Sequence, residues 1–330
     1  MTSSLPDGGS GLDANARRPI RVGQMRAKGL LEIAAGLYPA SSRDIANRVE
    51  IAISGHNDNV SVTLATGGLL LLPKVARRRI DIGWINPMAG LAMAVRGAGP
   101  FRAPLALRVL AVFPSLDWLV FAVRADSGIA SLADVRRRRY PLRIATRTLS
   151  RDDTTTFAIA EVLRFHGLSF RQIRAWGGEV HHHANPTSPR LIEAIRTGTV
   201  DAVFDEGVPI WGPDALAAGM RFLPMDGGVI DHMTRIGFRR AILPAGTYPG
   251  LAEDVVTLDF SGWPVFAHQD LDEEVAFAVC VAIEARAGLI PVDQTGPLAL
   301  RQLCTESQAC PIDAPLHPGA ERFYREHGYL

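Results

Sequence analysis

The sequence predicts a two-lobed α/β fold in which each lobe is a mostly parallel sheet flanked by helices. Two observations lead to this prediction. The chain has 330 residues, which exceeds the size at which a single hydrophobic core usually stops growing. Strand-like segments alternate with helix-like segments along most of the chain, and such alternation is typical of parallel sheets with helices on both faces.

The composition is that of an ordinary globular protein with no nucleic-acid partner. Hydrophobic residues make up 47% of the chain and charged residues 21%, which argues against extensive disorder. The 35 basic and 34 acidic residues leave a net charge of +1, so no overall field would attract nucleic acid. The longest apolar stretch, Leu105–Val123, contains Arg108, Pro114 and Asp117. We therefore expect two buried strands there and no insertion into a membrane.

The first residues predict a flexible tail and no export signal. Residues 1–19 are rich in Ser, Gly, Asp and Ala, and residues 1–21 contain no apolar run, which a secretory signal requires. From the chain as written we expect a cytoplasmic protein, or a periplasmic one if a signal was removed.

Two crossings between the lobes divide the rest of the chain. We expect the first lobe to comprise residues 20–123 and 249–330, and the second lobe residues 124–248. Leu105–Val112 and Trp118–Val123 follow each other without a helix, so they lead out of the first lobe, and an apolar strand near Val255–Leu258 is expected to return to it. When one lobe is built from two chain segments and the other from the segment between them, the cleft between the lobes can close by a hinge motion.

Three strand–loop units in the first lobe each end in polar residues. The expected strands are Ile20–Val22, Val49–Ile53 and Ile80–Trp84. The carboxyl ends of parallel strands meet at one edge of a sheet, where open α/β folds bind ligands. The expected ligand-binding residues of these loops are Gln24, Arg26, His56, Asn57 and Asn86, and Asn59 is expected at the same edge.

The second lobe is organised around Leu142–Leu168, which predicts a strand, a polar loop and a helix in succession. The unpaired N–H groups and the dipole of a helix N-terminus favour an anion. Thr146, Arg147, Arg151 and Thr154 are therefore expected to bind a ligand, with an arginine paired to its carboxylate. The alternative is that Thr154 only caps the helix and that the arginines are solvated or pair with Asp152 or Asp153.

Further strand ends supply the remaining candidates. We expect a strand at Ile173–Trp176, a loop at Gly177–Pro189, a strand at Val200–Phe204 and a loop at Asp205–Pro213. Trp176 would wall the cleft, or it would be an ordinary core residue. Asp205 and Glu206 would accept a hydrogen from a ligand ammonium or hydroxyl, act as acid or base in an enzyme, or cap a helix.

His181, His182 and His183 are the most visible local signal. Adjacent residues of an extended segment point to opposite sides, so at most two of the three could share one site, and no HExxH spacing is present. We therefore expect no metal site. An exposed or cleft-edge position is the simplest interpretation, although one imidazole could act as a general base. Cys280, Cys304 and Cys310 could supply one disulfide between the latter two, without zinc-binding spacing.

Four segments resemble the TAXI-type solute-binding proteins of TRAP transporters. These are PLHPGAERFYREHG at Pro315–Gly328, VRADSGIASLADV at Val123–Val135, GTVDAVFDEGVP at Gly198–Pro209 and LPAGTYPGLAEDVVTL at Leu243–Leu258. The resemblance implies a type II periplasmic-binding-protein fold that holds a small organic acid or amino acid between its lobes. It also implies a TRAP-type membrane transporter as partner if the chain is exported. The family usually begins with a cleaved export signal, and from residues 1–21 we expect no such signal in the chain as written.

These observations favour a solute-binding protein for a small carboxylate. The competing hypothesis is a cytoplasmic decarboxylase or dehydratase (a lyase) on the same fold, with His181, His182 or His183 and Asp205 or Glu206 as its proton-transfer groups. No phosphate-cradling glycine loop and no cofactor-binding lysine motif is present, so we expect no cofactor.

Overall fold

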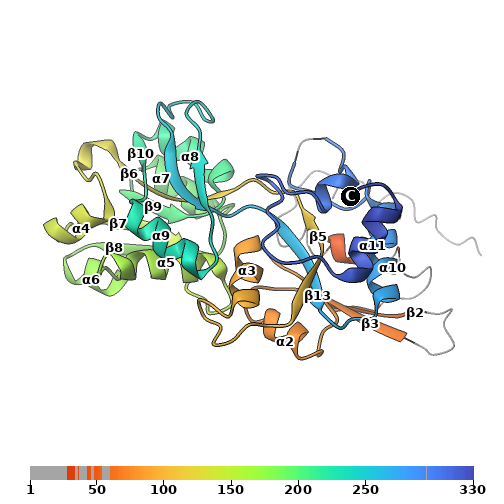
Figure 1. The fold of residues 1–330 in the computed structure, drawn as a ribbon. Coiled ribbons are helices and arrows are strands. Elements are labelled where there is room, and N and C mark those ends of the chain that lie inside the picture. The colour runs from red at the N-terminus through yellow and green to blue at the C-terminus, as the bar shows by residue number, and fades with distance from the viewer. Residues whose placement is uncertain (1–27, 34–35, 37–42, 46–47, 54–59, 295) are drawn as a thin grey trace, which may run out of the picture.

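The computed structural model describes residues 28–33, 36, 43–45, 48–53, 60–294 and 296–330. Two sheets form the centres of two lobes that lie side by side (Figure 1). The two-lobed α/β architecture is thus confirmed. The expected tail at residues 1–19 and the strand Ile20–Val22 lie outside the described residues.

The first lobe is a sheet in the order β1-β2-β3-β4-β13-β5. Its strands are β1 (Arg43–Ile45), β2 (Arg48–Ile53), β3 (Val60–Thr66), β4 (Ile82–Trp84), β5 (Leu107–Phe113) and β13 (Trp263–His268). Its helices are α2 (Leu72–Ala76), α3 (Met88–Arg96), α10 (Glu273–Arg286), the 3₁₀ helix η3 (Leu300–Leu303) and α11 (Pro318–Glu326), and residues 28–33 and 36 are also helical.

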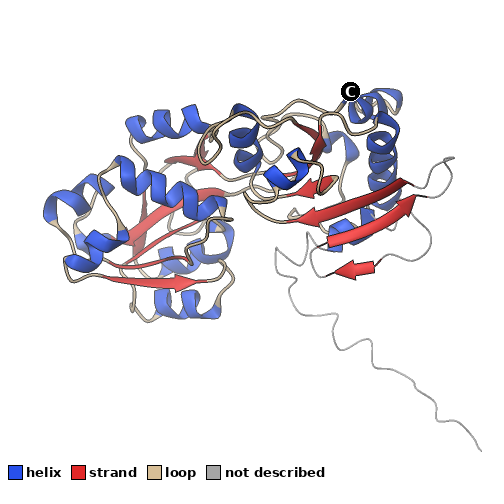
Figure 2. Cartoon of the chain, turned by 90° about the horizontal axis from the view of Figure 1, so that it is seen from below, coloured by secondary structure: helices blue, strands red, loops and turns tan. Residues whose placement is uncertain are grey.

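The second lobe is a sheet in the order β11-β12-β6-β9-β7-β8, with β10 also paired to β6. Its strands are β6 (Trp118–Arg124), β7 (Arg143–Arg147), β8 (Glu179–His183), β9 (Ala202–Asp205), β10 (Met220–Leu223), β11 (Arg240–Leu243) and β12 (Val255–Asp259). Its helices are the 3₁₀ helix η2 (Ala125–Ser127), α4 (Leu132–Arg138), α5 (Thr154–Phe165), α6 (Phe170–Ala175), α7 (Pro189–Arg196), α8 (Val208–Ala217) and α9 (Gly227–Ile236). Helices flank the strands of both sheets in Figure 2.

The sheets are mixed, so the expectation of mostly parallel sheets was wrong. Only the pairs β3–β4, β7–β8 and β7–β9 are parallel among the described strands. The strands next to the crossings are the physical reason, because β13 runs antiparallel to both β4 and β5 and β6 runs antiparallel to β9, β10 and β12. Alternation of strands and helices predicts parallel pairing only for strands joined by a helical crossover.

The two crossings lie side by side and are hydrogen-bonded to each other. The chain leaves the first sheet through residues 114–117 and returns through residues 260–262. Phe260 N donates to Asp117 O over 3.0 Å, and Gly262 N donates to Ser115 O over 3.0 Å. The sheet topology therefore places β6 and β12 in the second lobe, whereas the predicted boundaries divide the chain after residues 123 and 248. The apolar residues of β6 and β12 would be buried in either sheet, so the hydrophobic pattern alone does not show to which lobe these strands belong.

Several segments differ locally from the prediction. Residues 173–176, expected as a strand, belong to helix α6 and the turn after it, because Ser169 Oγ accepts from Gln172 N over 3.3 Å and starts a helix. The three histidines then lie in strand β8 rather than in a loop. Strand β3 has no counterpart in the prediction, and most of the expected loop Asp205–Pro213 is helix α8. The predicted helix Glu273–Arg286 is confirmed.

Two further observations concern the described residues only. None of their helices has both the length and the apolar character needed to cross a bilayer. Cys280, Cys304 and Cys310 are all buried free thiols, so the disulfide considered between Cys304 and Cys310 is not formed.

Candidate functional site

The two lobes contact each other directly through the loop after β3 and the loop before α5. Leu69 N donates to Asp152 O over 3.0 Å, and Leu70 N donates to Asp152 Oδ1 over 2.6 Å. A Cβ atom added at Gly68 would lie 1.6 Å from Asp152 O, so only glycine permits this approach. The lobes are therefore in direct contact at this point, and this arrangement is called closed below.

Arg147 lies at the end of β7 among three carboxylates. Its Nη2 is 3.2 Å from Asp205 Oδ1 and also contacts Glu206 Oε1, and its Nη1 is 4.0 Å from Asp153 Oδ2. The guanidinium meets Asp205 because β7 and β9 are adjacent parallel strands, with Thr146 opposite Phe204. The structure thus brings together three of the predicted site residues, Arg147, Asp205 and Glu206.

Burial controls the charge state of this cluster. Burial raises the pKa of Asp205 to about 7, although Arg147 acts in the opposite direction, and it also raises the pKa of Asp153. Burial opposes the charge on Arg147, but Asp205, Glu206 and Asp153 outweigh it, so the pKa of Arg147 is raised. The guanidinium therefore stays charged and is already engaged by carboxylates of the protein itself.

His183 is the only one of the three adjacent histidines, all described, that contacts this cluster's carboxylates. Its Nδ1 is 3.1 Å from Asn185 O, and its Nε2 is 3.3 Å from Asp205 Oδ2. The side chains of His183 and Asp205 are 4% and 0% exposed. The distance suits an ion pair, but Nε2 and Oδ2 lack hydrogen-bond geometry toward each other or any other described group. Burial and the charge of Arg147 lower the pKa of His183 to about 4, so the imidazole is neutral at pH 7.

This pair predicts a pH dependence of stability that one substitution would uncover. The folded pKa of Asp205 is raised from 3.8 to about 7, so its stabilising contribution is present below 3.8 and is lost as the pH rises through 7. The folded pKa of His183 is lowered from 6.5 to about 4, so its contribution is present above 6.5 and is lost as the pH falls through 4. The two slopes oppose each other between these limits.

In Asp205→Asn the slope due to His183 should remain without the opposing slope of Asp205, so the free energy of unfolding should rise between about pH 4.5 and 6.5. The slope of the variant should exceed that of wild type by up to about 1.4 kcal/mol per pH unit. Urea denaturation at several pH values measures this slope. Asp201→Asn, which removes the carboxylate that pairs with Arg143 Nη2 over 2.5 Å, is the control. Parallel pH profiles for wild type and Asp205→Asn would contradict the assignment.

Asp117 of the first crossing fixes the turn that follows Asp205 of β9 and contains Glu206. Its carboxylate accepts from Gly207 N over 2.7 Å and from Val208 N over 3.1 Å, at the start of α8. Burial, and then Glu206, raises its pKa. The helix is therefore held by Asp117, which sequence reasoning missed as a site residue. The one signal was a carboxylate inside the apolar stretch Leu105–Val123.

The N-terminus of α5 is already occupied by a carboxylate of the chain. Asp153 Oδ1 accepts from Thr155 N over 2.8 Å, so Asp153 rather than Thr154 is the cap, and a ligand anion would meet this carboxylate. Thr154 is buried and its Oγ1 has no hydrogen-bond partner among the described residues; a Cβ at Gly90 of α3 would lie 3.1 Å from it. Thr146 Oγ1 donates to Phe204 O over 3.0 Å, which is a structural role between strands.

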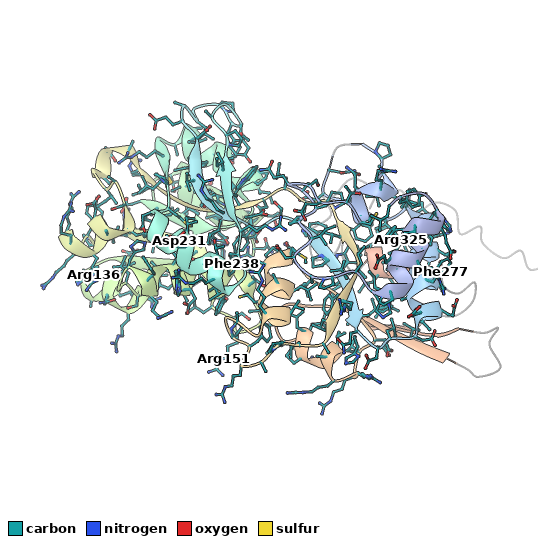
Figure 3. The ribbon with its side chains drawn as sticks, viewed as in Figure 1. Arg136, Arg151, Asp231, Phe238, Phe277 and Arg325 are labelled. Atoms are coloured by element: carbon teal, nitrogen blue, oxygen red, sulfur yellow. The ribbon has the colours of Figure 1, made fainter. Side chains whose placement is uncertain are left out.

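The remaining predicted residues are dispersed. Asn86 lies between β4 and α3, and its buried Oδ1 has no hydrogen-bond partner among the described residues. His181 Nε2 contacts Glu179 Oε2 over 3.0 Å, and His182 Nδ1 contacts Arg147 O over 3.1 Å. Trp176 and Arg136 line one pocket, and Arg136 lies at the end of the second lobe away from the first lobe (Figure 3). Trp176 therefore does not wall the cleft. The predicted Gln24, Arg26, His56, Asn57 and Asn59 lie outside the described residues.

A cavity of about 640 Å³ opens between the lobes at the loop that connects β7 to α5. Arg151 projects from this loop at the lower edge of the molecule in Figure 3. Unlike Arg147, it has no ion-pair or hydrogen-bond partner among the described residues. The cavity is lined by Leu69, Leu70 and Pro100 of the first lobe and by Leu149, Ser150, Arg151, Thr156, Phe157 and Ala160 of the second.

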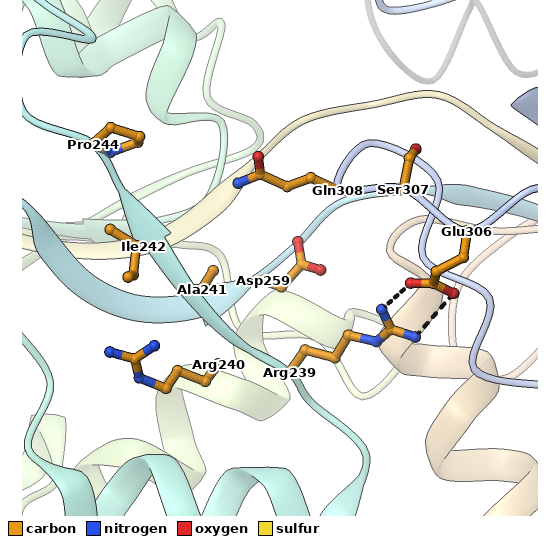
Figure 4. A pocket seen from close by; sticks show the side chains of 9 residues that line it. All are labelled: Arg239, Arg240, Ala241, Ile242, Pro244, Asp259, Glu306, Ser307 and Gln308. Carbon is orange, nitrogen blue, oxygen red and sulfur yellow. Dashed lines mark hydrogen bonds and ion pairs between the residues drawn. The ribbon is translucent and has the colours of Figure 1, made fainter.

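A second cavity, of about 460 Å³, lies beside β11 and the C-terminal segment (Figure 4). Two arginines line it, Arg239 and Arg240. Arg239 is engaged, because its Nε is 2.8 Å from Asp313 Oδ2 and its Nη1 contacts Glu306 Oε1. Arg239 precedes a strand of the second lobe, whereas Asp313 belongs to the segment that pairs with β5 through Leu316. These pairs hold the lobes together near the crossings. Within the described ranges no three His, Cys, Asp or Glu residues are grouped to hold a metal ion.

The sequence matches a known family over nearly its full length. A sequence model described as the NMT1-like family matches residues 34–328. This match includes both lobes and both crossings.

Solved structures with a similar course of the chain are distant in sequence. The alkanesulfonate-binding protein SsuA from Xanthomonas axonopodis pv. citri, bound to MOPS, is 17% identical with a TM-score of 0.32, over 68% of this chain and 58% of that chain. The aliphatic sulphonate-binding protein SsuA from Escherichia coli is 18% identical with a TM-score of 0.32, over 68% and 64%. PhnD1 from Prochlorococcus marinus, in complex with methylphosphonate, is 11% identical with a TM-score of 0.37, over 80% and 84%. The chain thus spans less than two thirds of either sulfonate-binding protein.

Proposed function

The chain belongs to the NMT1-like family, and from this premise we propose that it is a solute-binding protein that closes its two lobes on a small organic carboxylate. One observation carries the proposal. Leu69 and Leu70 of the first lobe and Leu149 and Arg151 of the second line one cavity. A ligand that touches both sides binds the closed arrangement better than an open one, which is how a solute drives hinge closure.

Arg147 and Arg151 differ in burial and in their partners, and this difference supports an anionic ligand where the two lobes meet. Arg147 is 11% exposed and already contacts Asp205 and Glu206, so it has little capacity left for a ligand. Arg151 is exposed and has no partner in the described part of the chain. A guanidinium recognises a carboxylate through two parallel hydrogen bonds. We therefore assign recognition of the ligand carboxylate to Arg151.

A thermal-shift screen of organic acids, amino acids and aromatic carboxylates should find compounds that raise the melting temperature. A ligand present at one hundred times its dissociation constant stabilises the folded state by about 2.7 kcal/mol. Ethyl esters of the same acids, which lack the negative charge, are the controls and should not stabilise. If no acid in the screen raises the melting temperature, or if the esters stabilise equally, the proposal fails.

The finer assignment follows the motif at Pro315–Gly328 that resembles the TAXI-type proteins. We propose on this ground a TAXI-type receptor that, if it is exported, acts in the periplasm with a TRAP-type membrane transporter as its partner. Fractionation of cells that express the full-length protein distinguishes this location from the cytoplasm.

The arrangement offers no specific support for the alternative of a decarboxylase or dehydratase. His183 and Asp205 are almost wholly buried and contact each other, while His181 and His182 contact Glu179 and the backbone of Arg147. Among these groups, none lines the cavity beside Arg151.

A further inference from the structure

We propose that the cavity between Leu70 and Leu149 binds an amphipathic carboxylate, whose hydrocarbon or aromatic body fills the cavity while its charge pairs with Arg151. This inference rests on the proposed function and narrows it, because it excludes amino acids and short polar acids as the preferred ligands.

The walls are apolar on both sides of the lobe boundary. Leu70 and Leu149 are 54% and 60% exposed, although they belong to different lobes and line the same cavity. Pro100, Phe157 and Ala160 complete the apolar surface. Covering exposed apolar surface is favourable in proportion to the area removed from water. A hydrocarbon body between the two leucines would therefore bind both lobes at once.

The charges of the cavity suit an anion and not an ammonium group. Arg151 is the one charged residue among the described residues that line it, and none of them is acidic. The neighbouring polar groups are already engaged, because Thr156 Oγ1 donates to Ser150 O over 2.6 Å and Ser150 Oγ accepts from Asp152 N over 3.1 Å. An amino acid would therefore place its ammonium group without a carboxylate partner, which is unfavourable.

The cavity is held in shape independently of a ligand. Asp152 follows Arg151 and fixes Leu69 and Leu70 through their backbone N–H groups. The volume of about 640 Å³ lies within the usual range of small-molecule pockets, about 300–1,000 Å³. Both walls are therefore in place before binding, which lowers the ordering cost of a ligand.

Isothermal titration calorimetry of the full chain with acetate, hexanoate, benzoate and 6-aminohexanoate tests the inference. Hexanoate and benzoate should bind at least about tenfold more tightly than acetate, because their bodies bury apolar surface. 6-Aminohexanoate should bind more weakly than hexanoate. Leu149→Ser and Arg151→Ala should each weaken hexanoate binding about tenfold. Arg151→Lys should keep part of the affinity that Arg151→Ala loses.

Two matched variants are the controls. Leu289→Ser changes a leucine that is 53% exposed in the first lobe, and Arg171→Ala removes an exposed arginine of α6; neither should change hexanoate affinity. Unchanged affinity in Leu149→Ser and Arg151→Ala, or equal affinity for acetate and hexanoate, would overturn the inference while leaving a solute-binding function at another site. Absence of binding by every carboxylate, in calorimetry and in the thermal screen, would overturn the proposed function as well.

Discussion

Arg147→Ala is expected to lower the free energy of unfolding by about 3–5 kcal/mol, because it leaves buried carboxylates without their counter-ion. Asp205 is fully buried, and Asp153 and Glu206 are 23% and 12% exposed. Removal of the guanidinium forces these groups either to stay charged without a partner or to bind protons. The loss should therefore be larger at pH 8 than at pH 5, where more of the carboxylates accept a proton.

Arg143→Ala is the matched control in the same strand. Arg143 and Arg147 both belong to β7, and each pairs with an aspartate on the neighbouring chain segment, Asp201 or Asp205. The side chain of Arg143 is 42% exposed, so its pair should contribute only about 0–1 kcal/mol. Urea denaturation compares the two variants, with one common value for the dependence of the unfolding free energy on urea concentration. Equal losses would show that burial does not decide the contribution of these pairs.

Gly68→Ala is expected to prevent the closed arrangement of the lobes. The added methyl carbon would lie 1.6 Å from Asp152 O of the other lobe, well inside any tolerable contact. The lobes must separate to relieve this overlap, so the radius of gyration should increase in small-angle X-ray scattering. Hexanoate affinity should fall at least about tenfold, because a ligand must then offset the cost of closure.

Gly288→Ala provides the control, since a Cβ atom at Gly288 would meet nothing within 4 Å. It should leave both the scattering profile and the affinity unchanged. The melting temperature of Gly68→Ala should stay close to that of wild type if each lobe keeps its own sheet. A closed, wild-type profile for Gly68→Ala would show that the contact between Gly68 and Asp152 does not control closure.

The local units were the part of the fold that could be predicted from the sequence. The predicted strand, loop and helix of Leu142–Leu168 correspond to β7 and α5. Such units are set by short-range periodicity and by residues such as Asp153 at a helix start. The direction of neighbouring strands could not be predicted, because β13 enters between β4 and β5 from far along the chain.

The site could be predicted only in part, because local patterns place residues at strand ends but do not show which strands are neighbours. Asp205 and Arg147 were each placed at a strand end, but their contact depends on the adjacency of β7 and β9, which no local pattern contains. Trp176 was misplaced because its segment was interpreted as a strand, whereas it follows a short helix capped by Ser169. The difference between Arg147 and Arg151 likewise required the fold, since the sequence places both in one polar stretch whereas only Arg147 belongs to β7.

The insertion of β13 between β4 and β5 also sets the order in which the lobes can be completed during synthesis. All strands of the second sheet come from one continuous stretch, residues 118–259, so this lobe can form once that stretch has left the ribosome. The first sheet stays split between β4 and β5 until Trp263–His268 emerges. Its two halves would meanwhile expose unpaired strand edges, which are prone to aggregation. A nascent chain whose residues up to 259 have emerged, while Trp263–His268 are still inside the ribosome, would therefore carry a finished second lobe beside an unfinished first one.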